Sequence, residues 1–107
     1  MSASGSGAFR VEVQPDSVLT LWGELDLATV QDLQDKIDEI MVPETPVVMD
    51  LAQLTFLDSS GMQCLIRTWM SSGYPVELRN ASDSVHRILD FVLSNDEPRP
   101  WVFRTSF

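Results

Sequence analysis

Short apolar segments alternate with amphipathic ones from residue 9 to about residue 93, and this alternation restricts the fold more than any other feature of the chain. The segments 9–14 and 18–22 each alternate apolar and polar side chains, as half-buried strands do. The Pro-Asp-Ser sequence between them favours a turn, so the two segments predict a β-hairpin. Further short apolar stretches lie at 47–51, 54–57, 75–79 and 101–103.

Three segments repeat apolar residues at the spacing of an α-helix. The first follows Thr29, which we expect to cap it with Asp32 in the capping-box position, and it ends before two prolines. The second ends near Gly73, a predicted C-cap, and the third begins after Ser82 or Asp83. The apolar stripes that we expect to face the core are Val30, Leu33, Ile37, Ile40 and Met41 in the first helix, Met62, Leu65, Ile66, Trp69 and Met70 in the second, and Val85, Ile88, Leu89, Val92 and Leu93 in the third. Strands that alternate with helices predict right-handed crossovers and a largely parallel sheet.

The chain has 107 residues, which suits one domain. We expect a single α/β domain at 9–94, with a mixed, mostly parallel β-sheet of four to five strands and helices packed against it. Residues 1–8 are expected to form a flexible tail, and residues 95–107 a C-terminal extension. The almost wholly apolar stretch at 47–51 predicts a strand that is covered on both faces.

The chain is acidic, with a net charge of −9, which makes it a poor candidate for binding nucleic acid or an anionic membrane. Residues 1–53 hold 10 acids and 2 bases, whereas residues 54–107 hold 6 acids and 5 bases. This asymmetry fits plain solubility, and it also fits steering toward a basic partner. The acids that we expect on the outer face of the first helix are Asp32, Asp35, Asp38 and Glu39.

No membrane-spanning segment or secretory signal is visible in the sequence. The longest apolar runs have only four or five residues. The first nine residues lack a basic start and an apolar stretch of signal length. We therefore expect a cytoplasmic protein without direct membrane contact. The sequence leaves the oligomeric state open, and a monomer is our expectation.

The scarcity of cysteine and histidine excludes several kinds of chemistry. A single cysteine, Cys64, cannot form an internal disulfide framework or a thiolate metal cluster, and we expect it to be a small buried residue. The single histidine, His86, leaves little scope for a metal site, so we expect neither a metal nor a cofactor. An enzyme with Ser59 or Ser60 as nucleophile would lack a general base, because His86 lies near the start of the third helix. We therefore expect no enzymatic activity.

The sequence Asp58-Ser59-Ser60-Gly61 follows an apolar stretch and opens the second helix. Asp58 or Ser59 is a natural N-cap, and ordinary capping explains much of this pattern. The position also suits a functional site, because partner chemistry in such sheets gathers after the carboxyl ends of strands and a helix N-terminus can hold an anion. Two hydroxyls are present where one would cap, and Gly61 in the first turn costs roughly 1 kcal/mol of helix propensity. We interpret the missing side chain of Gly61 as room for another protein's active site to approach the hydroxyls.

Two motifs resemble the STAS domain family (sulfate transporter and anti-sigma factor antagonist), namely "GELDLAT" at 23–29 and "VVMDLAQLTFLDSSGMQCLI" at 47–66. The resemblance covers roughly Phe9 to Leu93, and within the family the chain is similar to the bacterial anti-sigma factor antagonists. It implies that Ser59, directly after the aspartate, is phosphorylated by a partner serine kinase that is itself the anti-sigma factor. Unphosphorylated antagonist binds this kinase and frees a sigma factor, phosphorylated antagonist lets go, and a phosphatase acting on phospho-Ser59 resets the switch.

The resemblance also implies a partner-binding surface. Its residues are Asp26, Asp58, Ser59, Ser60, Gly61 and Met62. For Asp26, the sequence leaves open a second role as a loop cap for the first helix. The alternative function is that of a STAS-fold scaffold, or of a subunit of a signalling or lipid-transport complex, without phosphoswitching.

The three tryptophans lie in different contexts. We expect Trp22 and Trp69 in the core, because both belong to apolar patterns. Trp101 belongs to a stretch that packs back either as a short strand or as an extended tail, and an exposed tryptophan there could anchor a partner.

Overall fold

The computed structural model describes residues 9–92 and 99–104. Its elements, in chain order, are β1 (Phe9–Val13), β2 (Leu19–Leu25), α1 (Val30–Ile40), β3 (Val48–Leu57), α2 (Ser59–Ser72), β4 (Val76–Arg79), α3 (Asp83–Val92) and β5 (Trp101–Arg104). The α/β order predicted from the sequence is confirmed, and the stretch at 101–103, for which a short strand and an extended tail were both open, forms a strand. The tail predicted at 1–8 lies outside the described residues, as do Leu93 and the parts 95–98 and 105–107 of the predicted extension.

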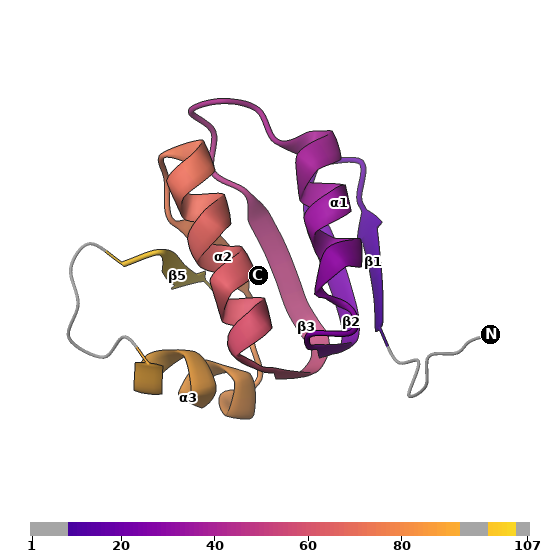
Figure 1. Cartoon of the computed structure of the whole chain (residues 1–107), viewed down its shortest axis with the longest axis vertical. Coiled ribbons are helices and arrows are strands. Elements are labelled where there is room, and N and C mark those ends of the chain that lie inside the picture. The colour runs from indigo at the N-terminus through magenta and orange to yellow at the C-terminus, as the bar shows by residue number, and fades with distance from the viewer. Residues whose placement is uncertain (1–8, 93–98, 105–107) are drawn as a thin grey trace.

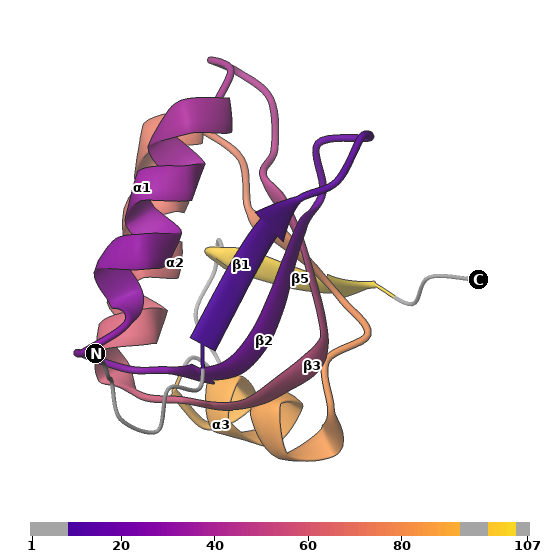
Figure 2. The ribbon, with the colours of Figure 1, turned by 90° about the vertical axis from the view of Figure 1, so that its right-hand side faces the viewer.

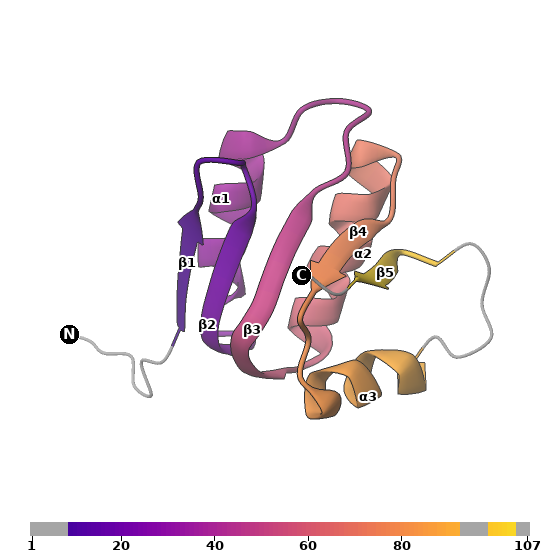
Figure 3. The ribbon, with the colours of Figure 1, turned by 180° about the vertical axis from the view of Figure 1, so that it is seen from behind.

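The strands form one sheet in the order β1-β2-β3-β4-β5, which is also their order in the chain. β1 and β2 make the predicted antiparallel hairpin, and the other neighbouring pairs are parallel. α1 and α2 lie side by side on one face of the sheet (Figures 1 and 2). The opposite face, turned toward the viewer in Figure 3, is left open by the described elements, and α3 lies below β4 and β5.

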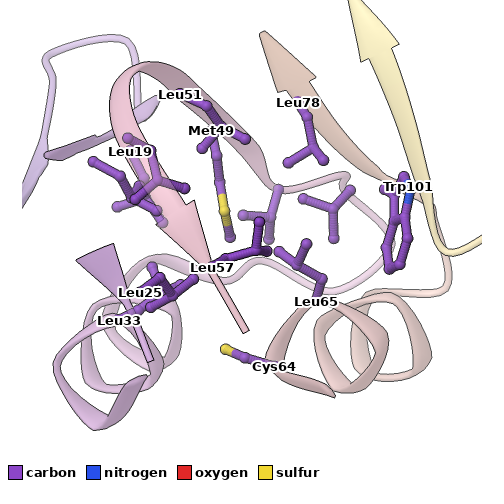
Figure 4. Close-up of a cluster of buried hydrophobic side chains, with 14 of the residues drawn as sticks. Leu19, Leu25, Leu33, Met49, Leu51, Leu57, Cys64, Leu65, Leu78 and Trp101 are labelled. Carbon is purple, nitrogen blue, oxygen red and sulfur yellow. The ribbon is translucent and has the colours of Figure 1, made fainter. Parts of the chain in front are cut away.

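The core fills the space between the sheet and the helices. Its largest fully buried side chains are Trp101, Leu19, Leu21, Leu25, Leu33, Ile37, Met49, Leu51, Leu54, Leu57, Leu65 and Leu78. Figure 4 shows part of this core, in which Leu33 of α1 and Leu65 of α2 point toward side chains of the strands. Burial of one such side chain contributes about 1.5–3 kcal/mol, so this layer fixes both helices on a single face of the sheet.

β3 is one strand of 10 residues, although the sequence predicted two separate apolar stretches at 47–51 and 54–57. Its pairing with β2 shifts register twice, first opposite Thr20–Trp22 and then opposite Gly23–Glu24. Each shift places an extra residue in β3, as β-bulges do. The β3 side chains that stay buried despite these bulges are Met49, Leu51, Leu54 and Leu57. The cover predicted on both faces of 47–51 is wrong, because α1 and α2 occupy one face and Asp50 on the other is partly exposed.

The tryptophan predictions are also corrected. Trp22 lies outside the core cluster and is only partly buried, with the Arg10 guanidinium carbon 4.1 Å from its ring centroid. Trp69 is partly buried outside the core cluster, and Met70, which was also predicted for the core, is 73% exposed. Trp101, in contrast, is 1% exposed and belongs to the core, so it is not an exposed anchor. Apolar spacing located these elements, but it could not show that each meets the core along one side only.

The predicted ends of α2 and α3 are confirmed. Gly73 has a φ of +83° and its N–H donates to the carbonyl of Trp69 at 2.9 Å, which makes it the C-cap of α2. The hydroxyl of Ser82 accepts from the N–H of Val85 at 3.2 Å, so Ser82 rather than Asp83 caps α3. The exposed acids of α1 also form the predicted acidic face, and they are Asp32, Asp35, Asp38 and Glu39.

Candidate functional site

The loops that follow β2 and β3 lie side by side, and together we call them the carboxyl edge (residues 26–29 and 58–60). Leu25 and Leu57 are paired as the last residues of the two strands. The N–H of Asp58 donates to the carbonyl of Leu25 at 3.1 Å, which holds the second loop against the end of β2. Figures 1 and 3 both show these two connections next to each other at the lower end of the sheet. The structure thus brings Asp26 near the Asp-Ser-Ser sequence, as the resemblance implied.

Asp58 is the N-cap of α2. Its Oδ1 accepts from the N–H of Ser60 at 2.9 Å and from the N–H of Gly61 at 3.3 Å. The cap that the sequence allowed at either Asp58 or Ser59 is therefore at Asp58. Because its carboxylate already binds two of the first N–H groups, this helix N-terminus is occupied by the protein's own anion.

Ser59 is the first residue of α2, and it is exposed. Within residues 9–92 and 99–104, its hydroxyl makes no hydrogen bond. Ser60 is partly buried, and its N–H is bound by the cap. Of the two hydroxyls, Ser59 thus offers the more accessible one on a helix start that the cap keeps rigid.

Gly61 faces the protein interior, which corrects the interpretation that it leaves room beside the hydroxyls. A Cβ added to Gly61 would lie 3.0 Å from Cγ and Cδ2 of Leu25 and 3.3 Å from Cβ of Leu57. The residue is itself buried. The absent side chain therefore lets the first turn of α2 approach the ends of β2 and β3. Met62, the next residue, is partly buried and packs against the core cluster.

Asp26 uses its side chain within its own loop. Its Oδ1 accepts from the N–H of Ala28 at 3.0 Å and lies 3.2 Å from the hydroxyl of Thr29. The carbonyl of Asp26 also accepts from the N–H of Val30 at 2.8 Å, which starts the first turn of α1. The loop-cap role that the sequence left open for Asp26 is therefore present in the structure.

The capping box predicted for Thr29 and Asp32 is wrong. Thr29 occupies the N-cap position of α1, but its side chain makes no capping hydrogen bond to the helix. Its hydroxyl instead donates to the carbonyl of Glu24 at 2.9 Å and accepts from the N–H of Asp26 at 3.0 Å. The physical reason is that the tight turn after β2 offers this hydroxyl closer partners than the helix does.

Leu27 is an exposed apolar residue of the carboxyl edge that the sequence patterns did not indicate. It lies between Asp26 and Ala28 in the loop, and it is 77% exposed. The signal available in the sequence was a leucine in a turn segment, outside the strand and helix patterns on either side.

The hollows that the structure describes lie away from the carboxyl edge. The described hollows, of about 110 and 440 Å³, lie beside the β1–β2 turn, and none of their lining residues belongs to this edge. In the described ranges, no group of three or more His, Cys, Asp or Glu residues could hold a metal ion. None of the described helices is long and apolar enough to cross a membrane.

The remaining reactive side chains lie elsewhere. His86 stacks on Phe103 with ring centroids 3.7 Å apart, and its Nδ1 lies 3.1 Å from Oδ2 of Asp90. It therefore lies on the side of α3 that faces β5. Cys64 is fully buried in α2, as predicted, and burial raises the pKa of its thiol.

Comparisons with known proteins show the family and the fold. The family model that matches the chain is described as "Mlab, STAS domain", and the match spans residues 9–92. Among solved structures, the chain is similar to the anti-sigma factor antagonist SpoIIAA in its unphosphorylated form, with 22% identity, a TM-score of 0.58 and coverage of 94% of this chain and 90% of that one. Another similar structure is an uncharacterized protein from the DUF3478 family with a SpoIIAA-like fold from Shewanella loihica PV-4, with 13% identity, a TM-score of 0.47 and coverage of 98% and 91%. The comparison with curated proteins gave no match. At 22% identity, the likeness to SpoIIAA confirms the fold.

Proposed function

This chain belongs to the STAS domain family, and from that premise we propose that it is an anti-sigma factor antagonist that is switched off by phosphorylation at Ser59. In its unphosphorylated form it binds an anti-sigma factor that is also a serine kinase, and so releases a sigma factor in the cytoplasm. Phosphorylation by the kinase ends the binding, and a phosphatase acting on phospho-Ser59 restores it. The protein is then a binding partner and a kinase substrate rather than an enzyme.

One observation carries this proposal, namely the position of Ser59. Its exposed hydroxyl stands on the first residue of a helix that Asp58 caps, at the edge where β2 and β3 end together. A kinase needs a hydroxyl that it can reach and that is held in a constant place. The exposure of Ser59 makes its hydroxyl reachable, and the Asp58 cap holds the start of the helix in a constant place.

Charge explains how a phosphate there would act. Phosphorylation adds about −1.5 to −2 charges, and two of the first N–H groups of α2 already bind the Asp58 carboxylate. The phosphate would therefore project from the surface instead of binding to these N–H groups of the helix. A partner carboxylate about 6 Å away would repel it by roughly 3 kcal/mol per pair of unit charges, at an effective dielectric constant of ~20. That repulsion weakens binding by about a hundredfold.

A second candidate is a STAS-fold scaffold or complex subunit without phosphoswitching. The observation that favours it is that capping and packing account for the Asp58–Gly61 sequence without any modification. This candidate requires an unmodified Ser59 and a stable resident partner at the carboxyl edge.

The experiment that separates the two candidates is peptide mass spectrometry of the protein recovered from its own cells. We expect a phosphate on Ser59 that is absent from the Ser59→Ala variant and retained in the Ser60→Ala variant, which loses the neighbouring hydroxyl. An unmodified Ser59 across growth and stress conditions would reject the switch and favour the scaffold.

A further inference from the structure

We propose that Leu27 is a docking residue for the kinase, which receives this side chain in an apolar socket flanked by basic groups. The inference rests on the proposed function and deepens it, because it assigns recognition of the partner to a residue other than the phosphoacceptor. In this proposal, phosphorylation of Ser59 determines whether the kinase stays bound, and contact with Leu27 provides binding affinity.

The exposure of Leu27 is the first argument. It is 77% exposed, and the neighbouring Ala28 is also exposed, so the tip of this loop is an apolar projection. Covering a leucine on association removes apolar surface from water, which favours binding by part of the value that burial in a core would give.

The rigidity of the loop is the second argument. Asp26 and Thr29, on either side of the tip, are joined by the hydrogen bond from the Asp26 N–H to the Thr29 hydroxyl at 3.0 Å. The Asp26 carboxylate binds the N–H of Ala28 at 3.0 Å, and the Thr29 hydroxyl is tied to the carbonyl of Glu24 at 2.9 Å. A side chain presented on a fixed turn loses less conformational entropy on binding than one on a mobile loop. Asp26 is therefore a positioning residue for Leu27.

The place of Leu27 is the third argument. It stands two residues beyond Leu25, and Ser59 stands two residues beyond Leu57, the residue that is paired with Leu25. Chain geometry, with the 3.1 Å hydrogen bond from Asp58 to Leu25, keeps the Cα atoms of Leu27 and Ser59 within about 18 Å. A standard interface covers ~800 Å² on each partner, which is roughly 30 Å across. One partner can therefore cover both residues at once.

The charge around Leu27 specifies the socket. The carboxyl edge and its flanking residues in the chain carry the acids Glu24, Asp26, Asp32 and Asp58, whereas the paired strand β1 brings one base, Arg10, opposite Trp22. A partner that buries Leu27 must approach this acidic surface, and basic groups around its apolar socket would complement it. A phosphate added to Ser59 makes the same surface more negative, so release has to come from repulsion or steric exclusion close to Ser59.

Single exposed apolar residues are common on protein surfaces, so the test needs a matched control. Met70 supplies it, because it is 73% exposed and lies in the last turns of α2, at the end of that helix opposite to Ser59. Leu27→Ser and Met70→Ser each replace one exposed large apolar side chain with serine. Neither residue belongs to the core cluster, so both variants should fold.

The experiment measures the initial rate at which phosphate appears on Ser59 of the purified full chain. The kinase source is an extract of the protein's own cells, supplied with ATP and a phosphatase inhibitor, and the chain is kept at a low concentration. We expect Leu27→Ser to lower the rate at least about tenfold, Met70→Ser to leave it unchanged, and a higher concentration of the Leu27→Ser chain to restore it. Recovery with concentration identifies a docking defect, whereas a damaged phosphoacceptor site would not recover.

Each other outcome has a definite meaning. Equal rates for all three chains would overturn the docking role of Leu27 and leave phosphorylation of Ser59 in place. Equal loss in both variants would overturn it as well, because the effect would not depend on the carboxyl edge. Absence of phosphate from Ser59 of the unaltered chain would reject the proposed function, and the docking role with it.

Discussion

Gly61 shows how a residue in a functional motif can be required by packing alone. Its α-carbon lies so close to β2 and β3 that an added Cβ would meet Leu25 at 3.0 Å and Leu57 at 3.3 Å. The backbone conformation is helical, so glycine is needed here for space and not for φ. This close approach seats the first turn of α2, and with it Ser59, on the ends of the strands.

We expect Gly61→Ala to lower the free energy of unfolding by about 1 kcal/mol. The overpacking cost of about 1–3 kcal/mol exceeds the gain in helix propensity of roughly 1 kcal/mol. Urea denaturation measures the difference. In the double variant, Leu25→Val removes one of the contacting carbons, so the loss should be smaller than the sum of the two single losses. A stabilised Gly61→Ala variant would show that Leu25 gives way at no cost.

The sequence predicted some side chains at the carboxyl edge and not others, for a physical reason. Asp58 was predicted as a cap because an N-cap depends only on the next two or three residues. The role of Asp26 stayed open, because a carboxylate after a strand can bind its own loop or a partner, and only the folded turn decides. Leu27 was missed because no local pattern states whether a loop leucine turns inward or stays exposed.

Cys64 places a thiol in the contact between α1 and α2. The side chain is fully buried, and Sγ lies 3.4 Å from Oε1 of Gln34 on α1. Burial raises the pKa of the thiol above its ordinary value of 9.0, while Arg67 and a hydrogen bond with Thr68 partly offset the rise. The folded protein therefore keeps Cys64 protonated at a pH where the unfolded chain begins to lose the proton.

This difference predicts a pH dependence of stability. When the folded pKa lies above the unfolded one, the folded state holds more protons between the two values, so stability falls as the pH rises above 9.0. For one group, the free energy of unfolding can fall by up to about 1.4 kcal/mol per pH unit between the two pKa values. Urea denaturation of wild type and Cys64→Ala from pH 8 to pH 10 tests it. The variant should start less stable but lose less stability with pH, and parallel curves would contradict the prediction.

Helices and strands were predictable because their periodicity is local. The bulges in β3 were not, because they depend on pairing with β2 at Thr20–Trp22 and Gly23–Glu24. The exposure of Met70 and the partial burial of Trp22 depend on which face of each element the rest of the fold covers. Periodicity identifies the row of apolar residues on each element. It does not show that α1 and α2 cover the same face of the sheet and leave the other face open.

Under the proposed function, phosphorylation would change the charge of the molecule at Ser59, and the fold gives no reason for its shape to change as well. Ser59 projects from a capped helix on a sheet whose core extends from β2 to Trp101 of β5. A negative charge at Ser59 meets Asp58 at the surface, where solvent screens the repulsion. The phosphorylated and unphosphorylated forms should therefore share one fold.

We expect Ser59→Glu and Ser59→Gln to unfold within about 1 kcal/mol of each other in urea, because exposed charges interact weakly. The two variants differ in charge and hardly in size. A larger loss for Ser59→Glu would mean that the added charge disturbs the α2 cap, and that the switch works partly by loosening the domain.

The order of the strands has a mechanical consequence. Because strand order in the sheet equals strand order in the chain, β1 and β5 form the two opposite edges. A pull between Phe9 and Arg104 would peel strands from the edges one hydrogen-bonded pair at a time, instead of shearing several ladders together. No hydrogen-bonded ladder joins the first described strand directly to the last, so we expect a force applied between them to load the four strand pairs one after another.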